Sequence, residues 1–237
     1  MSRPIIVGHR GAKGMAPENT LKAFKIGCLS ADMVECDIHL SKDGVLVVSH
    51  DDDLGRIVGV SGEIKDLTLE QLKRYDFGQG EKIPTLSEVI EIVRQSKKGL
   101  IIEIKGNSDE EASQVAGALL ELISKSRLPE NLYICSFWHS ILGLFKSGGI
   151  SFKTFVLIND ERGCDEIVKD VKKSKADGVG IRCEKITGEC VKKLHNSGYF
   201  INAWVADDKN TFDKMKELKV DWITSDYPKK ASEEFKL

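Results

Sequence analysis

The feature that most constrains the fold is a regular alternation between short apolar runs and longer amphipathic runs along the chain. Runs rich in Ile and Val predict buried strands, and the segments between them have the apolar spacing of helices. The expected strands are near residues 5–8, 33–39, 100–105, 132–136, 153–158, 178–182, 200–205 and 221–224. The expected helices are near 19–31, 86–97, 109–127, 139–147, 162–175, 187–196, 209–219 and 228–236. This order predicts an α/β fold, a (β/α)8 TIM barrel, with a doubly wound open sheet as the alternative.

One segment interrupts the alternation after the second expected strand. Residues 41–44 read Ser-Lys-Asp-Gly, a tight turn into the apolar run 45–50, so the chain is expected to double back as a hairpin. Residues 51–84 are rich in glycine and contain one expected short helix at 68–75. Long connections in compact domains are usually functional, so we interpret this insertion as a small cap over the barrel mouth. The whole chain, 1–237, is then expected to be one domain.

Charge and cysteine usage exclude several classes of protein. Lys and Arg number 35 against 37 Asp and Glu, a net charge of -2 that offers no footprint for nucleic acid. The six cysteines include no CxxC pair, and the sequence shows neither a signal peptide nor a long apolar span. These observations predict a reduced, cytoplasmic protein with no stable membrane association.

Two expected strands carry charged residues at alternate positions. Glu35 and Asp37 share one face of their strand, and Glu103 and Lys105 share one face of the next parallel strand. Both faces of a barrel strand are buried, so such charges must be paired or must bind a metal. The three carboxylates offer the oxygen ligands that Mg²⁺ or Ca²⁺ prefers. The alternative is a salt bridge at the barrel mouth between Glu35 or Asp37 and Arg10 or Lys105.

The histidines divide into two groups. His9 ends the first strand and His50 ends the hairpin, so both are expected at the same mouth of the barrel. Two imidazoles there could serve as general acid and general base on opposite sides of a scissile bond. We expect His39 to be exposed where it enters a turn, and His139 and His195 to be satisfied by backbone hydrogen bonds.

Positive charge accompanies these histidines. Arg10 follows His9 directly, and a guanidinium suits an oxyanion with several oxygens, such as phosphate. Together with Lys105, a hard metal and two proton-transfer groups, this set fits cleavage of a phosphoryl ester. Gly-x-Ser-x-Gly, Walker and Rossmann patterns are absent from the sequence, which disfavours serine hydrolases, NTPases and NAD enzymes.

At this point the chain resembles the glycerophosphodiester phosphodiesterase family. The matching residues occur in the family's order and span nearly the whole sequence. They are His9-Arg10-Gly11, Pro17-Glu18-Asn19-Thr20, Glu35-x-Asp37, Lys42-Asp43-Gly44, Val47-Val48-x-His50-Asp51, Ile83-Pro84-Thr85-Leu86, Glu103-x-Lys105, Trp204 and Ser225-Asp226-Tyr227-Pro228.

The resemblance implies roles for these residues. One divalent cation, Mg²⁺ or Ca²⁺, would bind the three carboxylates, the two histidines would form the acid/base pair, and Arg10 and Lys105 would contact phosphate. One or both of Phe137 and Trp204 could form an apolar wall for the glycerol carbons. The resemblance favours this role for Trp204, and for Phe137 a place in the aromatic core is an equal alternative. Trp138, beside Phe137, replaces a commonly polar position.

The implied reaction is hydrolysis of glycerophosphodiesters, such as glycerophosphocholine or glycerophosphoethanolamine, to sn-glycerol 3-phosphate and an alcohol. Either the glycerol 2-hydroxyl attacks phosphorus first, giving a cyclic phosphate, or water attacks directly. A lysophospholipase D or related phospholipase-type phosphodiesterase is an alternative, and Trp138 could then admit an acyl chain. A non-catalytic barrel that binds glycerophosphodiesters is an alternative of another class. Head group, physiological metal and oligomeric state are not specified by the sequence.

Overall fold

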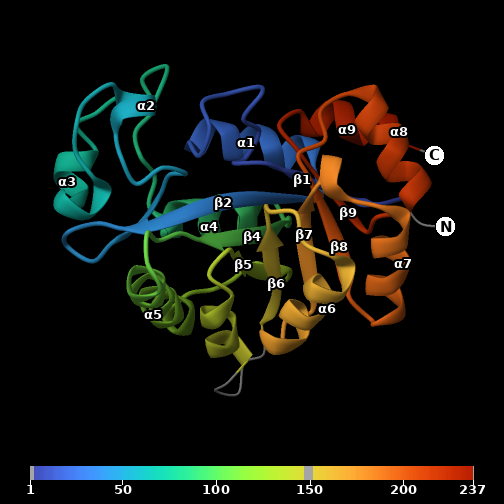
Figure 1. The fold of residues 1–237 in the computed structure, drawn as a ribbon. Coiled ribbons are helices and arrows are strands. Elements are labelled where there is room, and N and C mark those ends of the chain that lie inside the picture. Colours follow the sequence, from blue (N-terminus) through green and yellow to red (C-terminus); the bar gives the residue numbers. More distant parts are fainter. Residues whose placement is uncertain (1–2, 147–151, 237) are drawn as a thin grey trace.

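A computed structural model describes residues 3–146 and 152–236, and it confirms the predicted closed parallel barrel (Figure 1). Each barrel strand pairs in parallel with its neighbours, and β1 pairs with both β9 and β2, which closes the sheet. Strand β3 (Leu46–Val48) pairs antiparallel with β2 as the predicted hairpin. The barrel strands are β1 (Ile5–Gly8), β2 (Met33–Leu40), β4 (Gly99–Ile104), β5 (Leu132–Ser136), β6 (Lys153–Ile158), β7 (Gly178–Arg182), β8 (Phe200–Trp204) and β9 (Trp222–Ser225).

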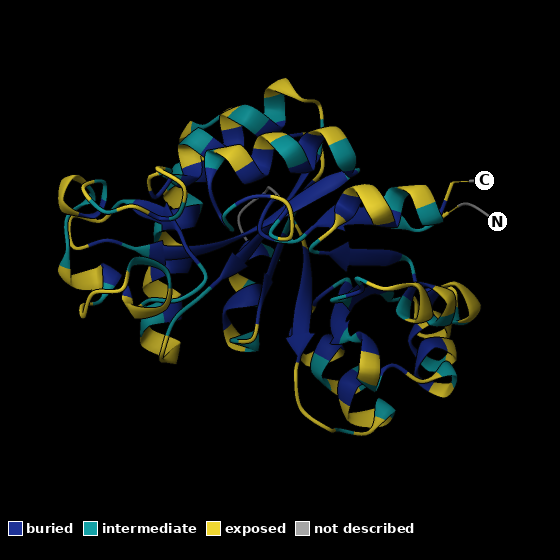
Figure 2. Cartoon of the chain, turned by 90° about the horizontal axis from the view of Figure 1, so that it is seen from above, coloured by how far each residue is buried: buried dark blue, intermediate teal, exposed yellow. Residues whose placement is uncertain are grey.

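Helices cover the outside of the barrel, with their exposed faces turned away from the strands (Figure 2). Thr20 caps α1 and Ser108 caps α5, each through its hydroxyl oxygen. The expected helix at 139–147 is a 3₁₀ helix, η2 (His139–Lys146), and residue 147 lies outside the described residues. The others are α1 (Leu21–Ser30), α4 (Leu86–Gln95), α5 (Asp109–Lys125), α6 (Cys164–Lys173), η3 (Cys183–Lys185), α7 (Gly188–Asn196), α8 (Lys209–Leu218) and α9 (Pro228–Glu234).

Strand alternation separates two apolar cores. Outward residues such as Ile6 and Val34 pack under the helices. Inward residues fill the lower interior of the barrel, the half nearer the amino ends of the strands. The inward set consists of Val7, Met33, Ile101, Cys135, Phe155, Leu157 and Trp222. Phe200 and Trp222 stack there with ring centroids 4.4 Å apart. Because Met33 and Glu35 are two positions apart, the same alternation that fills the lower barrel turns Glu35 into its upper interior.

The insertion has more helical structure than the sequence predicted. Three short segments replace the single expected helix: α2 (Gly55–Val58), η1 (Ile64–Asp66) and α3 (Leu69–Leu72). The Thr68 side chain caps α3 as part of a capping box, but the α-helix ends at Leu72 rather than continuing to Tyr75. A separate small core holds the segment together, and it stands to one side, beyond the end of β2 (Figure 1).

None of the helices within residues 3–146 and 152–236 combines the length and the apolar character needed to cross a bilayer.

Three aspartates in equivalent positions stabilise the end of the barrel at which the strands begin. An aspartate immediately precedes β2, β7 and β9, and its carboxylate accepts a backbone N–H from the strand before it. The pairs are Asp32 with Ile6 (2.9 Å), Asp177 with Thr154 (2.8 Å) and Asp221 with Ile201 (2.8 Å). Each carboxylate also faces a basic side chain, namely Arg3, Lys146 and His195.

We predict that Asp32→Ala lowers the free energy of unfolding by about 1–3 kcal/mol near neutral pH, because it leaves the Ile6 N–H unpartnered. Burial alone would raise the pKa of Asp32, but Arg3 and the Ile6 N–H lower it below its ordinary value. The stabilisation is therefore complete above the unfolded pKa of about 3.9 and disappears as pH falls through the lower folded-state pKa. Urea unfolding across this range should show the difference between wild type and variant shrinking in acid.

Asp213→Ala, on the exposed face of α8, is the matched control. An equal loss in the two variants, or a loss for Asp32→Ala that is independent of pH, would contradict this account.

Candidate active site

A cavity of about 340 Å³ opens at the carboxyl ends of the barrel strands. All the predicted site residues line it except Asp37, which is buried. The lining also contains residues that the sequence did not single out. It consists of His9, Arg10, Lys13, Glu35, His50, Glu103, Lys105, Cys135, Phe137, Phe155, Leu157, Asn159, Arg182, Asn202, Trp204, Val205 and Thr224.

The turn after β1 is set by close backbone packing. Gly11 has φ +81°, and a Cβ there would lie 2.6 Å from the carbonyl carbon of Ala23, so only glycine fits. Arg10 itself has φ +48°, an uncommon conformation for a residue with a side chain. Glu35 holds this strained turn, because its Oε2 accepts the Arg10 N–H at 2.9 Å. A carboxylate of the site thus also fixes the backbone that presents His9 and Arg10.

The three carboxylates converge as the strand pattern predicted. Asp37 and Glu103 are register partners on β2 and β4, and ligand oxygens from these two and Glu35 lie within 4.8 Å of one another. Lys105 Nζ lies 3.0 Å from Asp37 Oδ1 and also pairs with Glu103. Arg10 Nε lies 3.5 Å from Asp37 Oδ2. The salt bridges considered as an alternative are therefore present alongside the cluster.

The surroundings shift the pKa values of these acids in opposite directions: burial raises all three, and two neighbouring cations reverse the shift for Asp37. Burial, with Asp37 and Glu103 nearby, raises the pKa of Glu35 well above its ordinary value. Burial also raises the pKa of Glu103 to about 7, although Lys105 opposes that change. For Asp37, Lys105 and Arg10 outweigh burial and hold the pKa well below its usual range. Lys105 and Arg10 thus offset the negative charge of Asp37 best, and the charge of Glu35 is the least compensated of the three.

The donor set fits a hard divalent cation. All three side chains offer oxygen, and Glu35 Oε1 is buried without a hydrogen-bond partner among the described residues. A buried carboxylate oxygen lacking a partner is costly, and a cation would satisfy it. In the described part of the chain, no other group of at least three His, Cys, Asp or Glu residues brings its ligand atoms this close together.

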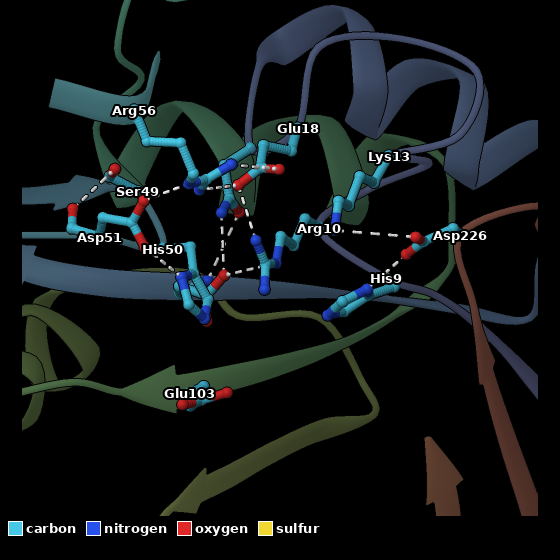
Figure 3. A network of polar contacts seen from close by, with 12 residues as sticks. His9, Arg10, Lys13, Glu18, Ser49, His50, Asp51, Arg56, Glu103 and Asp226 are labelled. Carbon is cyan, nitrogen blue, oxygen red and sulfur yellow. Dashed lines mark hydrogen bonds and ion pairs between the residues drawn. The ribbon is translucent and has the colours of Figure 1, made fainter. Parts of the chain in front are cut away.

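Both predicted histidines are held by an aspartate. His9 Nδ1 lies 2.5 Å from Asp226 Oδ1, and His50 Nδ1 lies 2.6 Å from Asp51 Oδ1 (Figure 3). An Nδ1–H donated to a carboxylate fixes the ring and leaves Nε2 for proton transfer. Burial, with Lys105 and Arg10 nearby, lowers the pKa of His50, although Asp37 opposes this shift.

Phe137 and Trp204, the residues predicted to form an apolar wall, both line the cavity. Phe137 and Trp204 meet edge to face with ring centroids 6.0 Å apart, and Phe137 is 40% exposed. The alternative place for Phe137 in the aromatic core is therefore wrong. Arg182 lies over the Trp204 ring, 5.6 Å from its centroid, a contact that the sequence did not predict.

The other histidines correct the sequence interpretation in part. His39 is buried rather than exposed: it lies within the hairpin, paired with Val47 of β3, and its Nε2 donates to the His50 carbonyl oxygen at 3.2 Å. His139 Nε2 donates to the Leu157 carbonyl oxygen at 2.9 Å, as expected. His195 instead pairs with the Asp221 carboxylate at 2.9 Å.

Two expectations about substrate contacts also need correction. Trp138 packs against the outer core and donates its Nε1–H to the Gly106 carbonyl oxygen at 2.9 Å, so it does not line the cavity. None of residues 51–84 lines the cavity, so the insertion stands beside the mouth rather than over it.

Several functional candidates escaped the sequence reasoning. Asp51 follows His50 directly, and Asp226 lies in the matched motif at residues 225–228. No local sequence pattern identifies either aspartate as the partner of a histidine. Asn202 is buried on β8, and its Oδ1 accepts the Thr224 hydroxyl at 2.9 Å. With its oxygen so engaged, the Asn202 amide nitrogen is left as the donor group for the cavity.

Comparisons with known proteins agree with this geometry. The sequence model of the glycerophosphoryl diester phosphodiesterase family matches residues 9–230. The chain is 36% identical over 234 residues to YhdW of Bacillus subtilis, covering 94% of each, and 33% identical over 235 residues to a glycerophosphodiester phosphodiesterase of Bacillus altitudinis, covering 95% of this chain and 96% of that protein. An Oleispira antarctica phosphodiesterase, solved with the product sn-glycerol-3-phosphate, superposes with a TM-score of 0.89 at 28% identity, over 98% of this chain and 96% of that one.

We predict that Mg²⁺ or Ca²⁺, added to protein stripped with a chelator, raises the melting temperature, because binding to the folded state alone stabilises it by about 2.7 kcal/mol at a hundredfold excess over Kd. Glu35→Gln should lose most of this rise, and thermal scans would measure it. Glu121→Gln, exposed on α5, is the control and should keep the full rise. An undiminished response in Glu35→Gln would place the cation elsewhere.

Proposed function

This chain is an enzyme of the glycerophosphoryl diester phosphodiesterase family, and from that premise we propose that it hydrolyses glycerophosphocholine, glycerophosphoethanolamine and similar diesters to sn-glycerol 3-phosphate and an alcohol. The observation that carries the proposal is the pairing of two aspartate-held histidines with a carboxylate cluster around one cavity. Binding alone has no need for two such proton-transfer groups, which disfavours a non-catalytic barrel.

Glu35, Asp37 and Glu103 would together hold a divalent cation, Mg²⁺ or Ca²⁺, which would offset negative charge on the phosphate oxygens. Arg10 and Lys105 would form ion pairs with the same phosphate, since both line the cavity beside the carboxylates. These fixed charges lie in a largely buried site, where they stabilise developing charge more strongly than in water.

His9 and His50 would divide the proton transfers. One Nε2 would accept the proton of the attacking hydroxyl, whether it is the glycerol 2-hydroxyl or water. The other would donate a proton to the leaving alcohol oxygen. Asp226 and Asp51 support both roles, because each holds its ring at Nδ1 and leaves Nε2 free to face the substrate.

The aromatic part of the cavity lining would bind the carbon skeleton. Phe137 and Trp204 would present apolar rings to the glycerol carbons, and Asn202 would donate its amide N–H to a glycerol hydroxyl.

The six cysteines are all free; Cys164 is half-buried and the others are buried. Free thiols of this kind support a reducing, cytoplasmic location.

We predict that the protein releases sn-glycerol 3-phosphate from glycerophosphocholine or glycerophosphoethanolamine, and that chelation stops the reaction. His9→Ala and His50→Ala should each lower kcat by about 100-fold or more, because each removes a proton-transfer group. A coupled assay for glycerol 3-phosphate measures the product across Mg²⁺, Ca²⁺, Mn²⁺ and chelator. His195→Ala is the control, because His195 pairs with Asp221 at the end of the barrel opposite the cavity.

Full turnover by either variant would contradict the acid/base assignment. Faster release from lysophosphatidylcholine would instead favour a lysophospholipase D. Ligand-induced stabilisation without any turnover would identify a binding protein.

We predict a bell-shaped dependence of kcat/KM on pH around neutrality, because one histidine must be neutral while the other is protonated. Activity should fall in acid as the acceptor becomes protonated, and fall in alkali as the donor loses its proton. Initial rates at saturating cation test this, and a profile with a single limb would mean that only one titrating group is needed.

A further inference from the structure

The insertion contributes one side chain that joins both halves of the proposed catalytic apparatus. Arg56, on α2, extends its guanidinium to two carboxylates at the barrel mouth (Figure 3). Its Nη2 and Nη1 donate to Glu18 Oε1 at 2.7 Å and Oε2 at 3.2 Å, and its Nε donates to Asp51 Oδ2. This fork uses the planar, multiply donating geometry that a lysine does not have.

Each of these carboxylates holds a proposed functional group. Asp51 uses its other oxygen, Oδ1, to hold His50 Nδ1 at 2.6 Å. Glu18 Oε1 accepts from Arg10 Nη1 at 2.7 Å. Arg56 does not itself line the cavity. Arg56 therefore contacts His50 only through Asp51, and Arg10 only through Glu18.

We propose that Arg56 is a positioning residue, which holds Asp51 so that Asp51 holds His50 in the orientation for proton transfer. Asp51 adjoins His50 in the chain and can rotate about its own side-chain bonds, so one hydrogen bond to the ring does not fix it. A second contact at Oδ2 fixes the carboxylate plane. The Glu18 side chain, only 10% exposed, anchors the guanidinium.

The same geometry predicts which kinetic constant changes. Arg10 keeps its contacts with Glu18 and Asp37 when Arg56 is removed, so phosphate binding should change little. His50 loses the support of its aspartate, so proton transfer should slow. This inference rests on the proposed function, because it assumes that His50 transfers a proton during turnover.

The test compares Arg56→Gln, Arg56→Lys and a matched control. Arg56→Gln should lower kcat for glycerophosphocholine about 10- to 100-fold with KM changed less than about threefold, as for other residues that orient a functional ligand. Arg56→Lys should recover only part of the loss, because one ammonium cannot replace the fork. The control is Arg74→Gln, which breaks an exposed Arg–Glu pair on the same insertion and should leave kcat unchanged.

A double-mutant cycle tests the route through Asp51. In an Asp51→Asn background, Arg56→Gln should lower kcat less than threefold, because the contact between Asp51 and His50 that Arg56 supports is already lost. Multiplicative losses, an unchanged kcat in Arg56→Gln, a rise in KM alone, or an equal loss in Arg74→Gln would each overturn the proposal. Thermal scans of the variants separate any of these results from unfolding.

NMR of the histidine ring nitrogens gives a readout that does not require turnover. The His50 signals, assigned with His50→Gln, should shift in Arg56→Gln and stay in place in Arg74→Gln. If the wild type showed no turnover, the proposed function would fail, and this spectrum would still decide whether Arg56 orients His50. Unshifted His50 signals in Arg56→Gln would overturn the positioning role.

Discussion

The site depends on one arrangement of buried charge: Asp37 held between Lys105 and Arg10 at the top of a parallel barrel. Each charge alone would be costly to bury, and removing one partner of such a set costs about 3–5 kcal/mol. Their mutual compensation allows Glu35 and Glu103 to lie beside them. Glu35 then fixes the strained turn at Arg10, so charge balance and backbone geometry support each other.

Around this centre, carboxylates act mainly as holders of other groups. Asp226 and Asp51 hold the two histidines, and Glu18 holds Arg10 and Arg56. At the opposite end of the barrel, aspartates before three strands hold backbone N–H groups. The barrel therefore uses the same side chain for stability at one end and for orientation at the other. This division agrees with the general separation of function and stability between the two ends of such barrels.

Much of the site could be predicted because strand geometry is local. The alternation Glu35-x-Asp37 and Glu103-x-Lys105 already places each pair on one face, whatever the rest of the chain does. The errors arose where burial or packing depends on distant elements. His39 is buried within the hairpin, Trp138 turns toward Gly106, and the insertion has its own core and stands beside the mouth. No local pattern distinguishes those outcomes from the ones that were expected.

The sequence by itself determined the strand-and-helix alternation and the residues presented at each strand's end, because side-chain direction follows from the period of the backbone. Only the tertiary structure decided which of those residues meet. His9 and Asp226 are 217 positions apart and come together because β1 pairs with β9 to close the barrel. Arg56 reaches Glu18 across 38 positions because the insertion packs against the mouth. Such contacts arise from closure and packing, which no local window of sequence contains.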